Sequence, residues 1–487
     1  MVSKQECLLY QQLNKLIEVN CHNNKRKVHL TPTERSKLIF IGDVLFLFLS
    51  IFISVVAWHY YTEVAHSYIL QISIMSFCLK MSWIILPWIF ISLIIDTYSF
   101  HHIRTLYSAL IGPCKVAFFV SVFYSILYFF APVGKYPRIV FLFFCIFSCV
   151  FLILWRLLYF FIFSQKKLQE RLFLIGHSDL FEPVVQIIQE NHLYYKIVGN
   201  APNCTMSNEI TEKCEHCLEY QKISDITDHI DKVVFAIDNP ISQDFLNFLI
   251  KLCEKGIPII PMPLFYEQLL QRTPVRNMKG WYLSFLPLNE IPTSFFYNFV
   301  KRVLDIIAAS LGLLCFGMIF PILAIIVKMS SPGPLFFSQM RVGKYGKPFR
   351  LWKLRTMYYN TEKDAMWTLQ SDDRITKPGR WLRKLHVDEL PQLWNVLKGD
   401  LSIVGIRPLS VEQCEKFAEV IPFHNLRHIS KPGLTGWAIV NFKHVNDIEG
   451  AKIRLEYDIY YIKYRSFFLD CWIILRTLWI MITLKGL

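Results

Sequence analysis

Three features are missing from this sequence, and each absence argues against a class of protein. The first 37 residues are polar and basic and contain no apolar core of the kind found in a cleavable signal peptide. We therefore expect this segment, residues 1–37, to stay in the cytosol. The turn Gly176-His177-Ser178 lacks the second glycine that lets a backbone approach a pyrophosphate, and no Tyr-x-x-x-Lys pair follows it in the same region. These absences argue against a dinucleotide-binding fingerprint and against a nucleotide-sugar dehydratase.

The composition is that of a membrane protein. Of the 487 residues, 53% are hydrophobic and 40 are phenylalanine, which is too apolar for an ordinary soluble chain of this length. The formal net charge of +14 fits soluble parts that lie against anionic lipid or handle anionic substrates, and we expect no nucleic-acid partner. The 13 cysteines are interpreted as reduced thiols, and the irregular spacing of Cys204, Cys214, His216 and Cys217 argues against a zinc site.

Four apolar stretches predict a transmembrane bundle over residues 38–165. Each is long enough, or nearly so, to cross the hydrocarbon as a helix, and they lie at approximately 38–59, 69–95, 114–131 and 138–163. By the positive-inside rule, the basic residues after the second and fourth stretches place both ends of this bundle in the cytoplasm. No charge lies deep in these stretches with an obvious partner, except Lys80 and Asp96 near their ends. A plain membrane anchor is therefore favoured over a channel or transporter.

Residues 166–285 have the pattern of a soluble α/β domain. Short apolar runs that end in glycine or proline alternate with helical spacing, which predicts half of a doubly wound, Rossmann-like sheet. The expected strands are 171–176, 195–199, 233–237 and 257–261, and the expected helices are 180–191 and 243–255. Because the dinucleotide fingerprint is missing, a regulatory or structural role is favoured for this domain over a nucleotide site.

The segment from Lys301 to Lys328 predicts a re-entrant membrane helix over residues 302–328. It is long enough to span the bilayer, yet basic residues lie at both of its ends. Pro321 removes one helical hydrogen bond, so we expect the helix to enter the membrane, break near Phe320-Pro321 and return. A fifth ordinary span is the alternative, and it would leave the remaining chain outside the cell.

The most informative stretch runs from Val387 to Asn395. Asp388 and Glu389 precede Pro391, after which apolar residues recur at helical spacing until Gly399. Carboxylates at a helix start stay ionised, and a phosphate can dock beside them, so we expect a lowered pKa for Asp388.

Basic residues flank this carboxylate pair on both sides. A run of alternating charged and apolar residues predicts a strand with a basic face that carries Lys353 and Arg355, and Arg383 and Arg407 bracket the pair in sequence. These four residues are the candidate phosphate-binding side chains. The apolar and aromatic run from Phe467 to Thr483 favours a helix that lies in the membrane interface.

Residues from about 300 to 487 resemble the catalytic domain of the bacterial polyprenyl-phosphate sugar-1-phosphate transferases, or monotopic phosphoglycosyl transferases, and we predict that this domain extends over 286–487. The first half resembles the long form of that family, of the undecaprenyl-phosphate galactose or glucose phosphotransferase type. The matching runs lie in order along the chain: Lys301-Arg302-Val303-Leu304-Asp305, Ser331-Pro332-Gly333-Pro334, Lys353 to Met357, Asp388 to Leu401, Arg407-Pro408-Leu409, Lys431 to Trp437, and Tyr460-Tyr461. Ile406, Ile439 and Phe320 depart from the usual residues of the family.

The resemblance implies the transfer of sugar 1-phosphate from a nucleotide diphosphate sugar, a UDP-hexose, to undecaprenyl phosphate, with release of UMP. It implies Asp388 as the nucleophile of a covalent aspartyl phosphosugar and Glu389 as its acid/base or metal-orienting partner. Mg²⁺ is the implied cofactor, bound by Asp388 and Glu389, and the implied pathway is O-antigen, capsule or exopolysaccharide assembly.

It further implies a multi-pass protein of the bacterial cytoplasmic membrane whose partners are the two substrates and inner-membrane lipids, with the mainly α catalytic domain facing the cytosol. A homodimer is left open. The rival interpretation is a scaffold of polysaccharide assembly whose site is vestigial.

Overall fold

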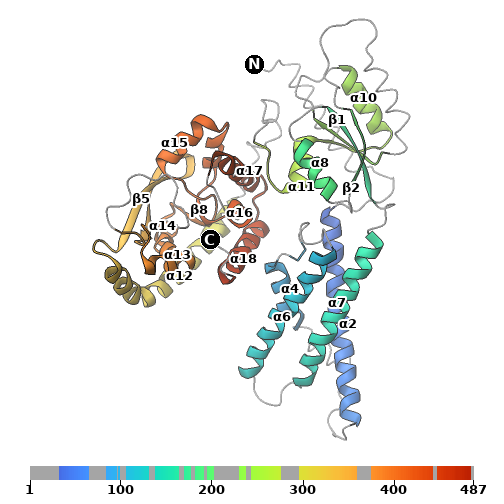
Figure 1. Ribbon diagram of the computed structural model, residues 1–487, viewed down its shortest axis with the longest axis horizontal. Helices are drawn as coiled ribbons and strands as arrows, with labels where there is room; N and C mark the ends of the chain where they lie inside the picture. Colours follow the sequence, from blue (N-terminus) through green and yellow to red (C-terminus); the bar gives the residue numbers. More distant parts are fainter. Residues whose placement is uncertain are drawn as a thin grey trace. The chain divides into compact units, whose positions relative to one another are not determined.

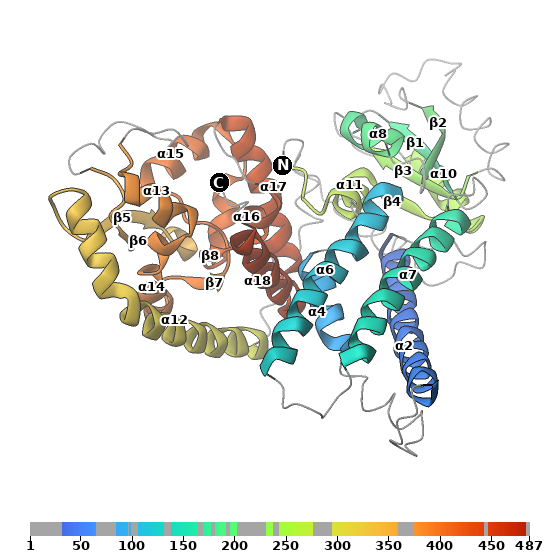
Figure 2. The same cartoon turned by 60° about the horizontal axis from the view of Figure 1, so that its bottom comes forward.

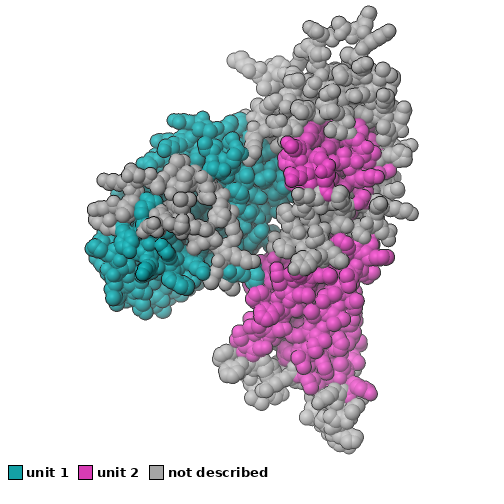
Figure 3. All heavy atoms as spheres, in the orientation of Figure 1, with its two compact units in different colours: residues 1–13, 178–180, 261–487 teal, residues 14–177, 181–260 magenta. Residues whose placement is uncertain are grey.

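The computed structural model describes residues 32–64, 84–95, 97–98, 106–130, 138–163, 169–176, 181–190, 195–201, 230–236, 243–275, 295–358, 374–442 and 447–483. The chain divides into two compact units, drawn in different colours in Figure 3. Within the described residues, one unit ends at residue 260 and the other begins at residue 261. The Gly176-His177-Ser178 turn beyond Gly176, the cysteine group around Cys214 and the residues Lys80 and Asp96 lie outside the described residues.

The first unit contains apolar helices at its N-terminal end. They are α2 (Pro32–Val64), α4 (Ile85–Ile94), α6 (Leu106–Phe130) and α7 (Arg138–Phe163). By length and composition, α2 and α7 can each cross a membrane, whereas the apolar parts of α4 and α6 are shorter. Helices α2 and α7 lie side by side, and α6 packs on α7 (Figure 1). Much of the second predicted stretch, 69–95, lies outside the described residues.

A buried ion pair joins α2 to α7. The sequence analysis predicted no paired charges deep in these helices, and this prediction is wrong. Arg156 donates to Asp43 over 2.6 Å, and the two side chains are 2% and 5% exposed. The two residues are 113 positions apart, so no local spacing indicates their contact. Each charge offsets the desolvation of the other, because an unpaired charge in these surroundings would be strongly unfavourable.

The same unit contains a four-stranded sheet in the order β2-β1-β3-β4. Its strands are β1 (Glu170–Gly176), β2 (Tyr195–Ala201), β3 (Lys232–Ala236) and β4 (Ile259–Pro261), and its helices include α8 (Phe181–Glu190) and α10 (Gln243–Glu254). Strand β1 pairs in parallel with both β2 and β3. All five residues of β3 are buried, as is usual for a central strand of a parallel sheet that is covered on both faces.

The second unit is organised around a long apolar helix, α12 (Phe295–Ser330). Figure 2 shows that this helix changes direction along its length. Pro321, where the sequence predicts a break, lies inside α12, which is helical on both sides of it. A proline removes one hydrogen bond, which allows a helix to bend without ending it. Residues on one side of α12, namely Phe316, Leu323 and Val327, pack into a core with Leu354 and Leu382.

Short elements of the second unit surround the carboxylate pair. An antiparallel hairpin consists of β5 (Phe336–Val342) and β6 (Pro348–Leu354), joined by the turn η5 (Lys344–Gly346). Lys353 lies on β6, as predicted, whereas Arg355 lies just beyond the end of this strand. Then follow α13 (Lys377–Lys384), η6 (Val387–Glu389) and α14 (Gln392–Lys398), and the parallel pair β7 (Ser402–Val404) and β8 (Gly433–Thr435).

The remaining helices close the second unit. They are α11 (Met262–Leu270), α15 (Val411–Val420), η7 (His424–Ile429), α16 (Trp437–Asn441), α17 (Ile448–Tyr464) and α18 (Phe467–Ile482). Buried residues of α15 and α17 form one core cluster, and buried residues of α16, α17 and α18 form another. The last apolar run is therefore helical, as predicted.

Helix α11 is attached to α17 by buried polar contacts. Glu267, which is 2% exposed, accepts hydrogen bonds from Lys463 and Tyr464 over 2.7 and 2.8 Å. Just beyond the helix, Gln271 accepts a hydrogen bond from the Trp437 indole over 2.9 Å. The sequence placed this helix in the preceding α/β domain, whereas its contacts group it with the second unit.

Candidate functional site

Asp388 and Glu389 lie on a short 3-10 turn, η6, directly before α14. Helix α14 begins at Gln392 and ends at Lys398, and the next residue, Gly399, has a φ of 97° in the left-handed region. The Arg302 side chain on α12 donates to the last-turn carbonyls of Val396 and Leu397 over 2.6 Å each. These bonds satisfy acceptors that a helix C-terminus leaves open. The apolar helix α12 is thereby tied directly to the helix that follows the carboxylate pair.

Two cations hold the carboxylate of Glu389. Lys353 on β6 donates to Oε1 over 2.7 Å, and Arg407 approaches the same oxygen at 3.3 Å. Burial raises the pKa of Glu389, but the positive charges of Lys353 and Arg407 outweigh this effect. The pKa of Glu389 therefore lies well below its usual range. Glu389 is therefore ionised at neutral pH.

Asp388 has the opposite environment. It is buried, 6% exposed, and its carboxylate has no hydrogen bond or ion pair within the part of the chain that the structure describes. Burial raises the pKa of Asp388, although the charges of Lys353 and Arg383 oppose this and that of Glu389 adds to it. The sequence analysis predicted a lowered pKa for Asp388, and this prediction is wrong. The pKa is raised because the loss of solvation on burial exceeds the attraction of the nearby cations.

The four predicted phosphate-binding cations do not all face the pair. Lys353 and Arg407 contact Glu389, and Arg383 is close enough to Asp388 to affect its pKa while donating from Nε to the Thr356 hydroxyl over 2.8 Å. Arg355 is different. It is 5% exposed and donates to backbone carbonyls at the end of α12, Ser331 over 2.6 Å and Pro332 over 2.9 Å. We therefore assign Arg355 to the support of this turn, not to substrate binding.

The position of Arg407 is fixed by residues that the sequence analysis did not assign to the site. Arg427 on η7 donates to the Arg407 carbonyl over 3.0 Å, and Arg341 on β5 donates to the next carbonyl, that of Pro408, over 2.9 Å. Arg427 in turn forms a buried ion pair of 2.9 Å with Asp458 on α17. A chain of contacts thus runs from α17 to Glu389, and no motif spacing indicates it.

Close approach of the backbone shapes the same loop. A Cβ atom on Gly436 would overlap the carbonyl oxygen of Gly405, and one on Gly405 would lie 2.5 Å from the carbonyl oxygen of Lys431. Glycine is required at both positions because these backbone segments touch. The loop that carries Arg407 therefore leaves β7 along a path that only glycine permits.

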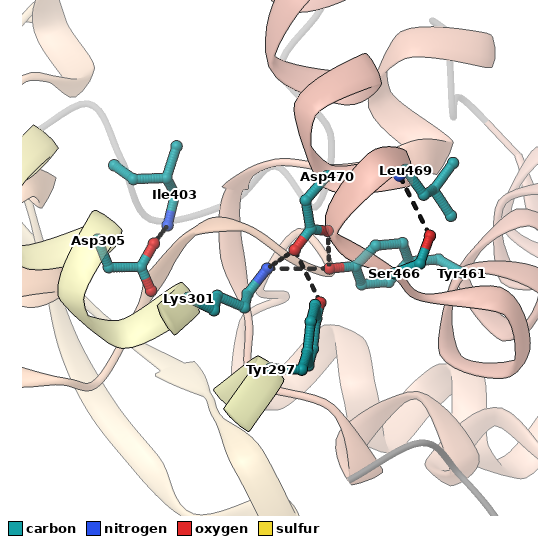
Figure 4. A network of polar contacts seen from close by, with 8 residues as sticks. All are labelled: Tyr297, Lys301, Asp305, Ile403, Tyr461, Ser466, Leu469 and Asp470. Carbon is teal, nitrogen blue, oxygen red and sulfur yellow. Dashed lines mark hydrogen bonds and ion pairs between the residues drawn. The ribbon is translucent and has the colours of Figure 1, made fainter. Parts of the chain in front are cut away.

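A polar network anchors the start of α12 to the last two helices (Figure 4). Asp470 on α18 accepts from Lys301 over 2.5 Å, and from Tyr297 and Tyr461 over 2.7 Å each. One turn further along α12, the Asp305 carboxylate accepts from the backbone N–H of Ile403 over 2.9 Å. Lys301 and Asp305 thus connect α12 to α18 and to the backbone of β7.

The donor chemistry of the carboxylate pair suits a magnesium ion. Mg²⁺ is commonly held by one or two carboxylates together with phosphates of the substrate. Asp388 offers such an oxygen, and the bonds that Glu389 accepts from Lys353 and Arg407 are both made by Oε1. Among the described residues, no group of three or more His, Cys, Asp or Glu side chains could hold a metal without such help. The residues present therefore fit a magnesium site that substrate phosphates complete.

The fold and the site define a membrane-associated, mostly helical protein with a cation-flanked carboxylate centre. Comparison with known sequences matches residues 296–484 to the family described as Bacterial sugar transferase. The chain is also 42% identical over 189 residues to the "Uncharacterized sugar transferase EpsL" of Bacillus subtilis, covering 90% of that relative and 39% of this chain. The chain belongs to the bacterial sugar transferase family.

Two longer relatives carry more specific names. The UDP-N-acetylgalactosamine-undecaprenyl-phosphate N-acetylgalactosaminephosphotransferase of Aeromonas hydrophila is 37% identical, and the match covers 50% of this chain and 57% of the relative. The UDP-glucose:undecaprenyl-phosphate glucose-1-phosphate transferase of Escherichia coli is 40% identical, with 47% and 49% covered. The matched part thus spans about half the length of these curated relatives.

Proposed function

We propose that this protein transfers a sugar 1-phosphate from a UDP-hexose to undecaprenyl phosphate, giving undecaprenyl-diphosphate sugar and UMP. The observation that carries the proposal is the contrast between the two adjacent carboxylates. Asp388 has no partner among the described residues, while Glu389 beside it is held by Lys353 and Arg407. The names of the two longer relatives describe the same type of transfer.

Asp388 is the proposed nucleophile. One of its carboxylate oxygens attacks the sugar-bearing phosphorus of the nucleotide sugar, and the bond from that phosphorus to the bridging oxygen of the diphosphate breaks, so that UMP leaves. An oxygen of undecaprenyl phosphate then attacks the same phosphorus and displaces Asp388. The raised pKa of Asp388 suits this role, because a more basic carboxylate is the better nucleophile once it is ionised.

The surrounding cations offset the charge that makes this reaction difficult. Attack of a carboxylate on a phosphate brings two anions together, and preorganised cations lower that barrier. Lys353, Arg383 and Arg407 supply positive charge from three different elements around the pair. A magnesium ion held by Asp388 and Glu389 would neutralise further phosphate charge when bound.

The apolar surface of α12 supports a membrane position for this site. Its exposed apolar side chains include Phe295, Leu311, Leu314, Met318, Ile322 and Ile325. We propose that α12 enters the cytoplasmic membrane of a bacterium and returns, with Pro321 as the residue that permits the return. This path would keep the carboxylate pair on the cytosolic face at headgroup depth. Inner-membrane lipids would then contact α12 and α18.

The remaining sequence-based assignments complete the proposal. Residues 38–165 would form a four-helix transmembrane bundle and residues 166–260 a Rossmann-like domain. The catalytic domain would consist of the predicted range 286–487 together with α11, whose contacts lie in the second unit. The product would feed the assembly of O-antigen, capsule or exopolysaccharide, and the protein would act alone or as a homodimer.

A product assay tests the proposed reaction. The purified full-length protein is incubated with undecaprenyl phosphate, Mg²⁺ and a panel of UDP-hexoses, and release of UMP is measured for each. We expect UMP release that depends on undecaprenyl phosphate with at least one sugar. Absence of release with every sugar, from a protein that is folded and membrane-inserted, would reject the proposal.

A further inference from the structure

Four arginines gather at the loop that carries Arg407. Arg427 and Arg341 donate to two successive carbonyls of this loop, those of Arg407 and Pro408. The fourth, Arg454, lies on α17 one turn before Asp458, and the charges of the other three act on it. Guanidinium groups from β5, η7 and α17 thus converge on the side of the pair where Glu389 is bound.

The carboxylates near this group are already in contact with other cations. Glu389 attracts Arg341 but is shared by Lys353 and Arg407. Asp458 attracts Arg454 but forms its ion pair with Arg427. Within the described residues, the arginines therefore outnumber the acids that balance them. Such an excess of partly buried positive charge is unfavourable unless an anion offsets it.

The individual guanidinium groups show the same imbalance. The Nε atoms of Arg341 and Arg454 are buried and have no hydrogen-bond acceptor in the part of the chain that the structure describes. Burial, followed by repulsion from Arg407, lowers the pKa of Arg454 to about 9 and that of Arg341 to about 10. Both side chains thus retain donors and positive charge that a ligand can use.

We propose that Arg454 and Arg341 form an anion-binding subsite beside Arg407 that accepts a phosphate dianion. The planar guanidinium fork matches the oxygens of a phosphate, and several forks around one anion give both affinity and orientation. The identity of the ligand rests on the proposed function, in which the nucleotide and the lipid each carry a phosphate. The subsite would take one of these while the sugar-bearing phosphorus faces Asp388.

Binding measurements on the full-length protein in nanodiscs test this subsite. The probes are UMP, measured by calorimetry, and undecaprenyl phosphate, measured through its KM in the transfer assay. The variant is Arg454→Met, and the control is Lys452→Met, which removes a partly exposed cation paired with Glu449 on the same helix. If the nucleotide occupies the subsite, Arg454→Met weakens UMP binding about 10-fold or more, as expected for lost charge-assisted bonds. Lys452→Met leaves it unchanged.

The second arm distinguishes the source of the phosphate. An unchanged affinity for UMP with a KM for undecaprenyl phosphate raised about 10-fold would assign the subsite to the lipid. Unchanged values for both probes would overturn the proposal. Arg454→Lys, which keeps the charge but loses the fork, should give an intermediate loss for whichever ligand binds there.

Thermal stability separates a binding role from a structural one. Because Arg454 is repelled by three neighbouring arginines, Arg454→Met should leave the Tm of the ligand-free protein unchanged or raise it. It should also reduce the rise in Tm that the ligand of the subsite, UMP or undecaprenyl phosphate, causes. A lower Tm together with unchanged affinities would overturn the subsite. The proposed transfer can fail separately: Arg454-dependent UMP binding without turnover would reject the reaction and leave the subsite standing.

Discussion

Asp388 and Glu389 are neighbours in sequence whose carboxylates have opposite tendencies to ionise. Burial raises the pKa of Asp388, whereas Lys353 and Arg407 overcome burial at Glu389 and lower its pKa. Two carboxyl groups with separated pKa values can take different roles in one reaction. The structure therefore favours Glu389 as a constant negative charge that holds the cations, and Asp388 as the group that reacts.

Substitution of each carboxylate should separate these roles. Asp388→Asn should lower turnover at least ~10³-fold and abolish covalent labelling by a nucleotide sugar that carries radioactive β-phosphate, because the amide is a poor nucleophile. Glu389→Gln should slow turnover by roughly 10²-fold yet still allow labelled protein to form. Steady-state rates of the unchanged protein should give parallel double-reciprocal lines. Intersecting lines, or labelling of Asp388→Asn, would exclude the aspartyl intermediate.

The dependence of activity on pH should report the ionisation of Asp388. Its carboxyl must be ionised to attack, so kcat/KM should fall as the pH drops through a pKa above the usual aspartate range. Lys353 lowers this pKa by attraction, so Lys353→Met should raise it and shift the acidic limb of the profile to higher pH. The comparison variant is Arg350→Met, an exposed cation on the same strand, which should leave the limb in place. If Lys353→Met leaves the acidic limb of the pH profile at the same pH, the limb does not report the ionisation of Asp388.

At the scale of elements, α17 holds the Arg407 loop through one buried ion pair. The Asp458 and Arg427 side chains are 3% and 4% exposed and 2.9 Å apart. Asp458→Asn leaves Arg427 charged and buried without its partner, so we expect a loss of about 3 kcal/mol of stability. The KM for the nucleotide sugar should rise as well, since Arg407 is no longer held toward Glu389. Denaturation and steady-state kinetics measure the two effects.

The same helix offers a control for this prediction. Glu449 and Lys452 form an exposed pair on α17, and Glu449→Gln should change stability by less than about 1 kcal/mol. Equal effects of the two substitutions would show that the buried pair has no special part in holding the loop.

Local patterns in the sequence predicted several elements correctly because local physics forms them. Alternating residues predicted β6, and helical spacing ended by Gly399 predicted α14. The predictions from sequence were wrong where the contacts or the pKa of a side chain depend on residues distant in the chain. Arg355 lies in the basic run beside Lys353, but the tertiary fold turns its guanidinium to the carbonyls after α12. The sign of the Asp388 pKa shift depends on burial, which no spacing encodes.

At the scale of the whole molecule, the path of α12 decides on which side of the membrane the site lies. If α12 enters and returns, cysteines introduced just before residue 295 and just after residue 330 should react with a membrane-impermeant thiol reagent from the same, cytosolic side. The positive charges at both ends of the segment give the reason. Reaction of the second position from the periplasm would instead mean that α12 crosses the membrane.

Truncation should show where the catalytic unit begins. A chain of residues 261–487 keeps α11 and its contacts with α17, whereas a chain of 286–487 leaves Lys463 without Glu267 and Trp437 without Gln271. We expect the longer chain to have the higher Tm and to retain more transfer activity, because the shorter one exposes or leaves unpaired these buried polar groups. Equal Tm values for the two chains would show that α11 is dispensable.

The network around Asp470 also sets an order of events during synthesis. Lys301 and its partner Asp470 are 169 residues apart in the chain. At a translation rate of about 5–20 residues per second, Lys301 leaves the peptidyl transferase centre roughly 8–34 s before its partner is made. During this interval the charged end of α12 lacks Asp470 as its partner, and a chain whose synthesis stops before α18 would lack the contact that anchors this helix.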